Sequence, residues 1–160
     1  MKKQLRSFFC AFRGVGDAVR GEAHLRFHLV AAFYVLLFSP FFELSAAQYA
    51  VLVLLMGAVM AAEMINTAVE RVCNAVTEER NENIRLAKDI AAGAVLVLSA
   101  AAVAVAALFF LDGAAWLRVW DFFMQKPWLL PPLVCSAALA VVFVRRGTGR
   151  KRGDNRDSKG

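Results

Sequence analysis

Five polar side chains recur along one largely apolar stretch of the chain. They are Glu63, Asn66, Thr67, Glu70 and Asn74. On an α-helix, which turns about 100° per residue, they fall within a stripe roughly 100° wide. Carboxylates on one face of a helix can divide the work of a group transfer, because one can remove a proton from a hydroxyl while another holds a divalent cation through its oxygens. This stripe is therefore the first candidate for a site.

Three residues elsewhere in the chain can complete such a site. Lys88 supplies a cation that can reach a phosphate. Asp89 and Glu22 each supply a further carboxylate. Each of them alone is more often a solvated interfacial charge or an anchor at the membrane surface. His24 and His28 have the i, i+4 spacing of a metal pair, but no second pair accompanies them, so we interpret them as interfacial histidines.

Membrane helices must position these residues. The chain is 59% hydrophobic with a mean hydropathy of +0.53, and its apolar residues form long uncharged runs. A bilayer requires about 20 such residues per helix. The runs that meet or approach this length are Phe27 to Phe42, Ala46 to Ile65, Ile90 to Leu111 and Trp128 to Val144. A helix end emerging into water is an alternative explanation for the polar residues beyond Ile65, but Glu63 falls inside the run, and ionisable residues inside a membrane mark functional sites.

Positive charge predicts how these helices are oriented, since short loops rich in Lys and Arg stay in the cytoplasm. Residues 1–26 hold six such residues, 66–89 hold four and the tail after Val144 holds seven, whereas 112–127 hold two and 43–45 hold none. Four spans place 17 of the 19 on one side. We therefore predict a multi-pass protein of the cell inner membrane with both termini cytoplasmic. The net charge of +6 then reflects topology and attraction to anionic lipid, and we expect no nucleic-acid partner.

The segment before the first run is typical of an amphipathic helix at the membrane surface. Its apolar residues recur at spacings of three and four: Leu5, Phe8, Phe9, Phe12, Val15 and Val19. A helix packed on protein is an equal alternative and leads to similar geometry. Between the second and third runs we expect a short turn near Asn81 to Asn83. The predicted fold is an all-α integral membrane protein with an N-terminal interfacial helix, three transmembrane helices and a fourth, C-terminal one.

The polar stripe and its partners resemble a known pattern. The stretch Glu63-Met-Ile-Asn-Thr-Ala-Val-Glu70, followed by Ala87-Lys88-Asp89 and then Ala-Ala-Gly-Ala-Val, resembles the signature of the small prokaryotic diacylglycerol kinase and undecaprenol kinase family. Glu22, which precedes Glu63 by 41 residues, also fits that pattern. The resemblance covers residues 5–111 and joins two separate specific motifs.

The resemblance implies a lipid kinase that transfers the γ-phosphate of ATP to a membrane lipid hydroxyl, with Mg²⁺ as cofactor. By matched position, Glu63 is the general base and binds the substrate, and Asn66 lies beside the acceptor hydroxyl. The implied ATP contacts are Glu22, Glu70, Lys88 and Asp89, of which the two glutamates also bind the metal. The family further implies a homotrimer with active sites shared between subunits. Diacylglycerol and undecaprenol are both open as acceptors, giving phosphatidic acid or undecaprenyl phosphate.

Two features depart from the family pattern. Asn74 stands where the family usually has Asp, which removes one negative charge near the nucleotide, and a fourth span follows the three of core members. We expect a kinase domain over 1–111, an extra loop and the fourth span over 112–144, and a basic disordered tail over 145–160. The alternatives are a non-enzymatic membrane protein, such as a transporter whose Glu63 carries a proton, and a kinase homologue that has lost activity.

Overall fold

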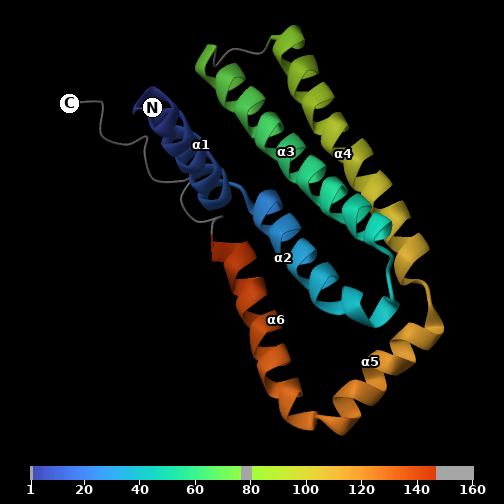
Figure 1. Cartoon of the computed structure of the whole chain (residues 1–160). Helices are drawn as coiled ribbons and strands as arrows, with labels where there is room; N and C mark the ends of the chain where they lie inside the picture. Colours follow the sequence, from blue (N-terminus) through green and yellow to red (C-terminus); the bar gives the residue numbers. More distant parts are fainter. Residues whose placement is uncertain (1, 77–80, 147–160) are drawn as a thin grey trace.

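The computed structural model describes residues 2–76 and 81–146, and every regular element in that part of the chain is helical. The elements are α1 (Lys2–Gly21), α2 (Ala23–Phe38), the 3₁₀ helix η1 (Ser39–Phe42), α3 (Ala46–Val76), α4 (Glu82–Phe110), α5 (Gly113–Gln125), the 3₁₀ helix η2 (Pro127–Leu129) and α6 (Leu130–Arg145). In Figure 1, α1 lies toward one end of the bundle and α5 lies at the other. The tail expected to be disordered lies outside the described residues from 147 onward.

Within residues 2–76 and 81–146, four helices are long and apolar enough to cross a membrane, which agrees with the predicted number of spans. They cover Ala23–Phe42, Ala46–Val76, Glu82–Phe110 and Pro127–Arg145. At about 1.5 Å per residue, α3 is about 46 Å long, whereas the hydrocarbon core of a bilayer is about 30 Å thick. The surplus length carries the last turns of α3, with most of the polar stripe, out of the apolar layer.

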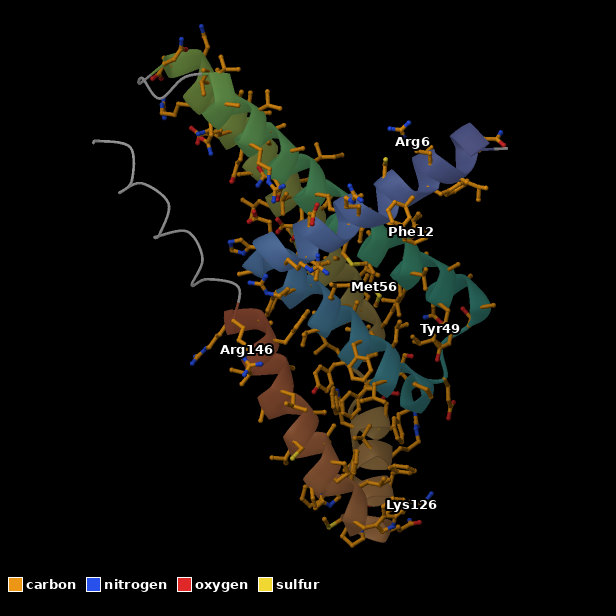
Figure 2. The ribbon with its side chains drawn as sticks, turned by 90° about the vertical axis from the view of Figure 1, so that its left-hand side faces the viewer. Arg6, Phe12, Tyr49, Met56, Lys126 and Arg146 are labelled. Carbon is orange, nitrogen blue, oxygen red and sulfur yellow. The ribbon has the colours of Figure 1, made fainter. Side chains whose placement is uncertain are left out.

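The first two helices meet at a break in the backbone. Glu22 is extended (φ −115°, ψ 120°), which ends α1 and lets α2 start in a new direction. In Figure 2, α1 runs across the direction of the other helices. Its apolar residues Leu5, Phe8, Phe9, Phe12 and Val15 are exposed. This is the arrangement predicted for a helix whose apolar face rests on lipid.

The second and third spans, α3 and α4, lie side by side as an antiparallel hairpin (Figure 1). Asn81 starts α4, because its side chain accepts hydrogen bonds from the backbone N–H groups of Asn83 (2.9 Å) and Ile84 (3.4 Å). Such a cap satisfies donors that have no partner inside the helix. The third span therefore begins at Glu82, within the expected turn.

The connection between the third and fourth spans, expected as a loop, is mostly helical. Asp112 caps the start of α5 by accepting a hydrogen bond from the N–H of Ala114 (2.9 Å). Arg118 donates two hydrogen bonds to the carbonyl oxygen of Phe41, at 3.0 and 2.9 Å, and so ties α5 to the end of the first span. The rings of Phe42 and Trp116 add an edge contact. A helix in this segment was not foreseen because it is too short and too charged to read as a span.

The fourth span, α6, returns along α2. The hydroxyls of Tyr34 and Ser136 are 2.9 Å apart, and the guanidinium of Arg26 donates to the carbonyl oxygen of Val144 at 3.3 and 3.1 Å. The C-terminal end of α6 therefore lies at the same end of the bundle as the α1–α2 junction. Figure 2 marks this end of α6 by Arg146.

Candidate active site

Glu63 is a buried carboxylate close to where α3 leaves the apolar layer. It lies about 26 Å along α3 from the helix start, which compares with a hydrocarbon thickness of about 30 Å. Its side chain is only 9% exposed, and its Oε1 is 3.3 Å from Nε2 of His28 on α2. Withdrawing a carboxylate from water is costly unless a partner compensates it. The structure therefore pairs Glu63 with a histidine from the neighbouring helix.

Asn66 and Glu70 continue the stripe toward the end of α3. The amide nitrogen of Asn66 donates to Oε1 of Glu70 at 3.3 Å. Among the described residues, the amide oxygen of Asn66 is buried without a hydrogen-bond partner. Buried polar atoms are normally paired, so an acceptor left open in this position suits a ligand that brings a hydroxyl or amine donor.

Lys88 reaches the stripe from α4, whereas Asp89 does not. Nζ of Lys88 donates to Oδ1 of Asn74 at 2.7 Å, which places its charge beside the last turns of α3. Asp89 instead accepts from Arg85 at 3.3 Å, within its own helix. The structure thus brings Lys88 to the predicted site and leaves Asp89 on the exposed face of α4.

Glu22 lies at the same end of the bundle as Glu70. It occupies the N-cap position of α2, but its carboxylate makes no capping hydrogen bond. The neighbouring Gly21 packs so closely against α3 that an added Cβ would lie 3.0 Å from Nη2 of Arg71. Because Arg71 follows Glu70 directly, the α1–α2 junction and the polar end of α3 are neighbours.

Two carboxylates at this end of the bundle, those of Glu22 and Glu70, are candidates for holding a divalent cation. The described part of the chain holds no group of three or more His, Cys, Asp or Glu side chains that could share a metal ion. Mg²⁺ is usually held by one or two carboxylates together with phosphate oxygens and water. Glu22 and Glu70 supply that number of carboxylates.

An apolar cavity of about 350 Å³ adjoins His28 within the membrane layer. Its walls come from α2, α3 and α4 and include Phe27, Ala31, Met56, Val59 and Val103. Ser99 also lines it, and the Ser99 hydroxyl is buried without a hydrogen-bond partner among the described residues. Val59 precedes Glu63 by one helical turn. The cavity therefore offers space for hydrocarbon one helical turn along α3 from the buried carboxylate.

Comparison with known proteins identifies the family. Residues 9–110 match the model of the family described as prokaryotic diacylglycerol kinase. The chain belongs to this family. The kinase is 33% identical over 111 residues to an undecaprenol kinase from Bacillus subtilis, an alignment that covers 69% of this chain and 90% of that protein. It is 38% identical over 102 residues to a diacylglycerol kinase from Synechocystis, covering 63% of this chain and 58% of that protein. No solved structure matches it significantly.

The family match confirms the resemblance and makes this protein a multi-pass membrane lipid kinase. The matched region ends at residue 110, which is also the last residue of α4. Helices α5 and α6 therefore lie outside the part of the chain that the family model matches.

Three residues beside the candidate site, His28, Arg26 and Ser99, were not predicted from the sequence to take part in it. His24 is exposed, as expected for an interfacial histidine, but His28 turns inward onto Glu63. The buried Arg26 and the cavity hydroxyl of Ser99 were not foreseen. One signal was present: Arg26 and His28 follow Glu22 at intervals of four and six residues, which places them within two turns of a predicted site residue.

Proposed function

We propose that this kinase transfers the γ-phosphate of ATP to the hydroxyl of a membrane lipid, diacylglycerol or undecaprenol, at the cytoplasmic surface of the inner membrane. The products are phosphatidic acid or undecaprenyl phosphate, together with ADP. Both termini lie in the cytoplasm. The charge pattern of the loops supports this orientation, and the resemblance to the family supports a homotrimer with shared active sites.

One observation carries the proposal: a buried carboxylate lies between an apolar cavity and a polar, cation-bearing helix end. The cavity below Glu63 suits the hydrocarbon part of the acceptor. The side chains of Glu70 and Lys88, farther along the same face, suit the phosphates of a nucleotide. A lipid hydroxyl held at Glu63 would then face the γ-phosphate across the membrane boundary.

The proposed step is a direct phosphoryl transfer. Glu63 removes the proton of the lipid hydroxyl as its oxygen bonds to the γ-phosphorus, and the bond from that phosphorus to the β,γ-bridging oxygen breaks with ADP as the leaving group. Asn66, whose buried amide oxygen has no partner among the described residues, lies beside the acceptor hydroxyl, while the single proton of that hydroxyl is directed at Glu63. Glu22 and Glu70 would hold the Mg²⁺ of the nucleotide, which would neutralise phosphate charge. Lys88 would contact the nucleotide from beside the stripe, and Asp89 would contact it from the exposed face of α4. This chemistry depends on positioning and charge neutralisation.

A direct test uses the full chain in detergent, radiolabelled ATP with Mg²⁺, and either diacylglycerol or undecaprenol. The wild type is expected to label one or both lipids. Glu63→Gln removes the base while keeping the side-chain shape, so we expect lipid labelling to fall at least about 100-fold. The lipid labelled faster identifies the acceptor.

Glu43→Gln is the matched control, because Glu43 is an exposed carboxylate at the opposite end of the spans. It should label lipid like the wild type. A wild type that labels neither lipid would count against the proposal. Full activity of Glu63→Gln would remove Glu63 from the role of base.

A further inference from the structure

The contact between His28 and Glu63 has no part in the transfer step described so far. Its two side chains come from adjacent spans and are 35 residues apart in the sequence. Nε2 of His28 and Oε1 of Glu63 are separated by 3.3 Å, and the side chains are 22% and 9% exposed. Both therefore meet in a place with little access to water, and His28 also lines the apolar cavity.

No other basic side chain in the described part of the chain contacts Glu63. Arg26, two residues before His28, is buried, but its guanidinium is bound to backbone carbonyl oxygens of α1 and α6. On α4, the residue that lines the same cavity and carries a polar group is Ser99. Along α3 the nearest carboxylate, Glu70, is bound by Asn66. The environment therefore assigns Glu63 one nitrogen partner.

A base is effective only when one of its oxygens faces the proton that it removes. Catalytic bases are commonly oriented by a third group that binds the atom not used in the reaction. A neutral histidine can do this for a carboxylate, because one ring nitrogen carries a hydrogen. At 3.3 Å the two atoms form a close polar contact rather than an aligned hydrogen bond, and catalytic contacts of this kind commonly tighten and align when substrate binds.

We propose that His28 is a positioning residue for Glu63. The Nε2–H group donates to Oε1, which fixes the carboxylate plane and leaves Oε2 directed at the lipid hydroxyl. In the transfer step, Oε2 gains the hydroxyl proton, the lipid oxygen forms its bond to the γ-phosphorus, and ADP leaves. His28 keeps its own proton throughout. This inference deepens the proposed function and rests on it.

Three variants of the full chain separate positioning from packing. His28→Ala removes the donor and is expected to lower kcat for lipid phosphorylation about 10- to 100-fold, the usual cost of losing a group that orients a functional side chain, with KM for ATP unchanged. His28→Gln keeps an N–H donor at similar reach and should recover most of that loss. His24→Ala changes the exposed histidine one turn earlier and should behave like the wild type.

A spectroscopic measurement tests the contact without activity. In protein labelled with ¹⁵N-histidine, the Nε2 resonance of His28 should shift in the Glu63→Gln variant, while that of His24 should not. His28→Ala should also cost nothing further when Glu63 is already Gln, because a positioning residue acts only through the residue it positions.

The outcomes distinguish this inference from the function on which it rests. A wild type that phosphorylates neither lipid overturns the proposed function. A wild type that is active, with His28→Ala equally active or His28→Gln as impaired as His28→Ala, overturns the positioning role alone. An unchanged His28 resonance in Glu63→Gln overturns it as well, even if His28→Ala fails to fold.

Discussion

Replacing Arg26 with Met should destabilise the fold more than any other exchange of one arginine in the described chain. Arg26 is 3% exposed. It donates to the carbonyl oxygens of Val19 (2.8 Å) and Arg20 (3.0 Å) at the end of α1, and twice to that of Val144 at the end of α6. The last carbonyls of a helix have no partner within it and carry partial negative charge. One guanidinium thus donates hydrogen bonds to the terminal carbonyl groups of two helices.

The magnitude follows from these contacts. A hydrogen bond to a charged group contributes about 1.5–3 kcal/mol, and a buried acceptor left without its donor costs about 1–3 kcal/mol. The carbonyls lie near the membrane boundary, where water can replace part of the loss, so we expect Arg26→Met to lower the free energy of unfolding by about 3 kcal/mol. Tyr34→Phe, which removes the single bond to Ser136 on the same interface, should cost only about 1 kcal/mol.

Unfolding of the detergent-solubilised protein by sodium dodecyl sulfate, followed by circular dichroism, measures these differences. Arg6→Met is the matched control, because Arg6 is an exposed arginine on α1. It should leave the free energy of unfolding within about 0.5 kcal/mol of the wild type. If Arg26→Met also stays within that range, the guanidinium does not join the helix ends in solution and the reasoning is refuted.

Two further predictions concern the nucleotide end and the membrane orientation. Because Lys88 already donates to Asn74 at 2.7 Å, Asn74→Asp should change turnover by less than about fivefold. Asn74→Ala should raise KM for ATP by about fivefold, the effect of losing one hydrogen bond, and steady-state kinetics measure both values. If the wild type is inactive and Asn74→Asp restores its activity, the chain is an inactive homologue. The three tryptophans, Trp116, Trp120 and Trp128, are exposed and lie in or beside α5. Their fluorescence should be quenched more by lipids brominated near the headgroup than by lipids brominated near the chain ends, since tryptophan is enriched at the membrane boundary. The reverse order would place α5 inside the apolar layer.

The sequence predicted the spans because their physical requirement is local. A helix in lipid must satisfy its backbone internally and present about 20 apolar residues, so each run can be counted without knowing its neighbours. The same holds for the surface helix, whose apolar spacing is visible within 20 residues. The polar stripe was also predictable, because Glu63 is the one charged residue in the apolar run Ala46 to Ile65.

Contacts between distant segments were not predictable in this way. His28 meets Glu63 across 35 residues and Arg26 meets Val144 across 118, and hydropathy does not determine which face of one span meets another. Helix α5, which connects the third and fourth spans, was not predicted for a different reason. Its charged residues, Arg118 and Asp121, interrupt the apolar pattern, and its position is fixed by contacts with η1.

The fourth span contacts the α1–α2 junction through Arg26 and Val144, and none of its residues lines the apolar cavity. Helix α2 has two faces: His28 and Ala31 line the cavity shared with α3 and α4, whereas Tyr34 faces α6. Because α6 reaches only the second face, it cannot line the proposed acceptor site. Its carbonyl at Val144 instead completes the binding of Arg26, which lies between Glu22 and His28 on the same two turns. Loosening α6 should therefore disturb the residues proposed for the nucleotide and for the base together, leaving the cavity walls in place.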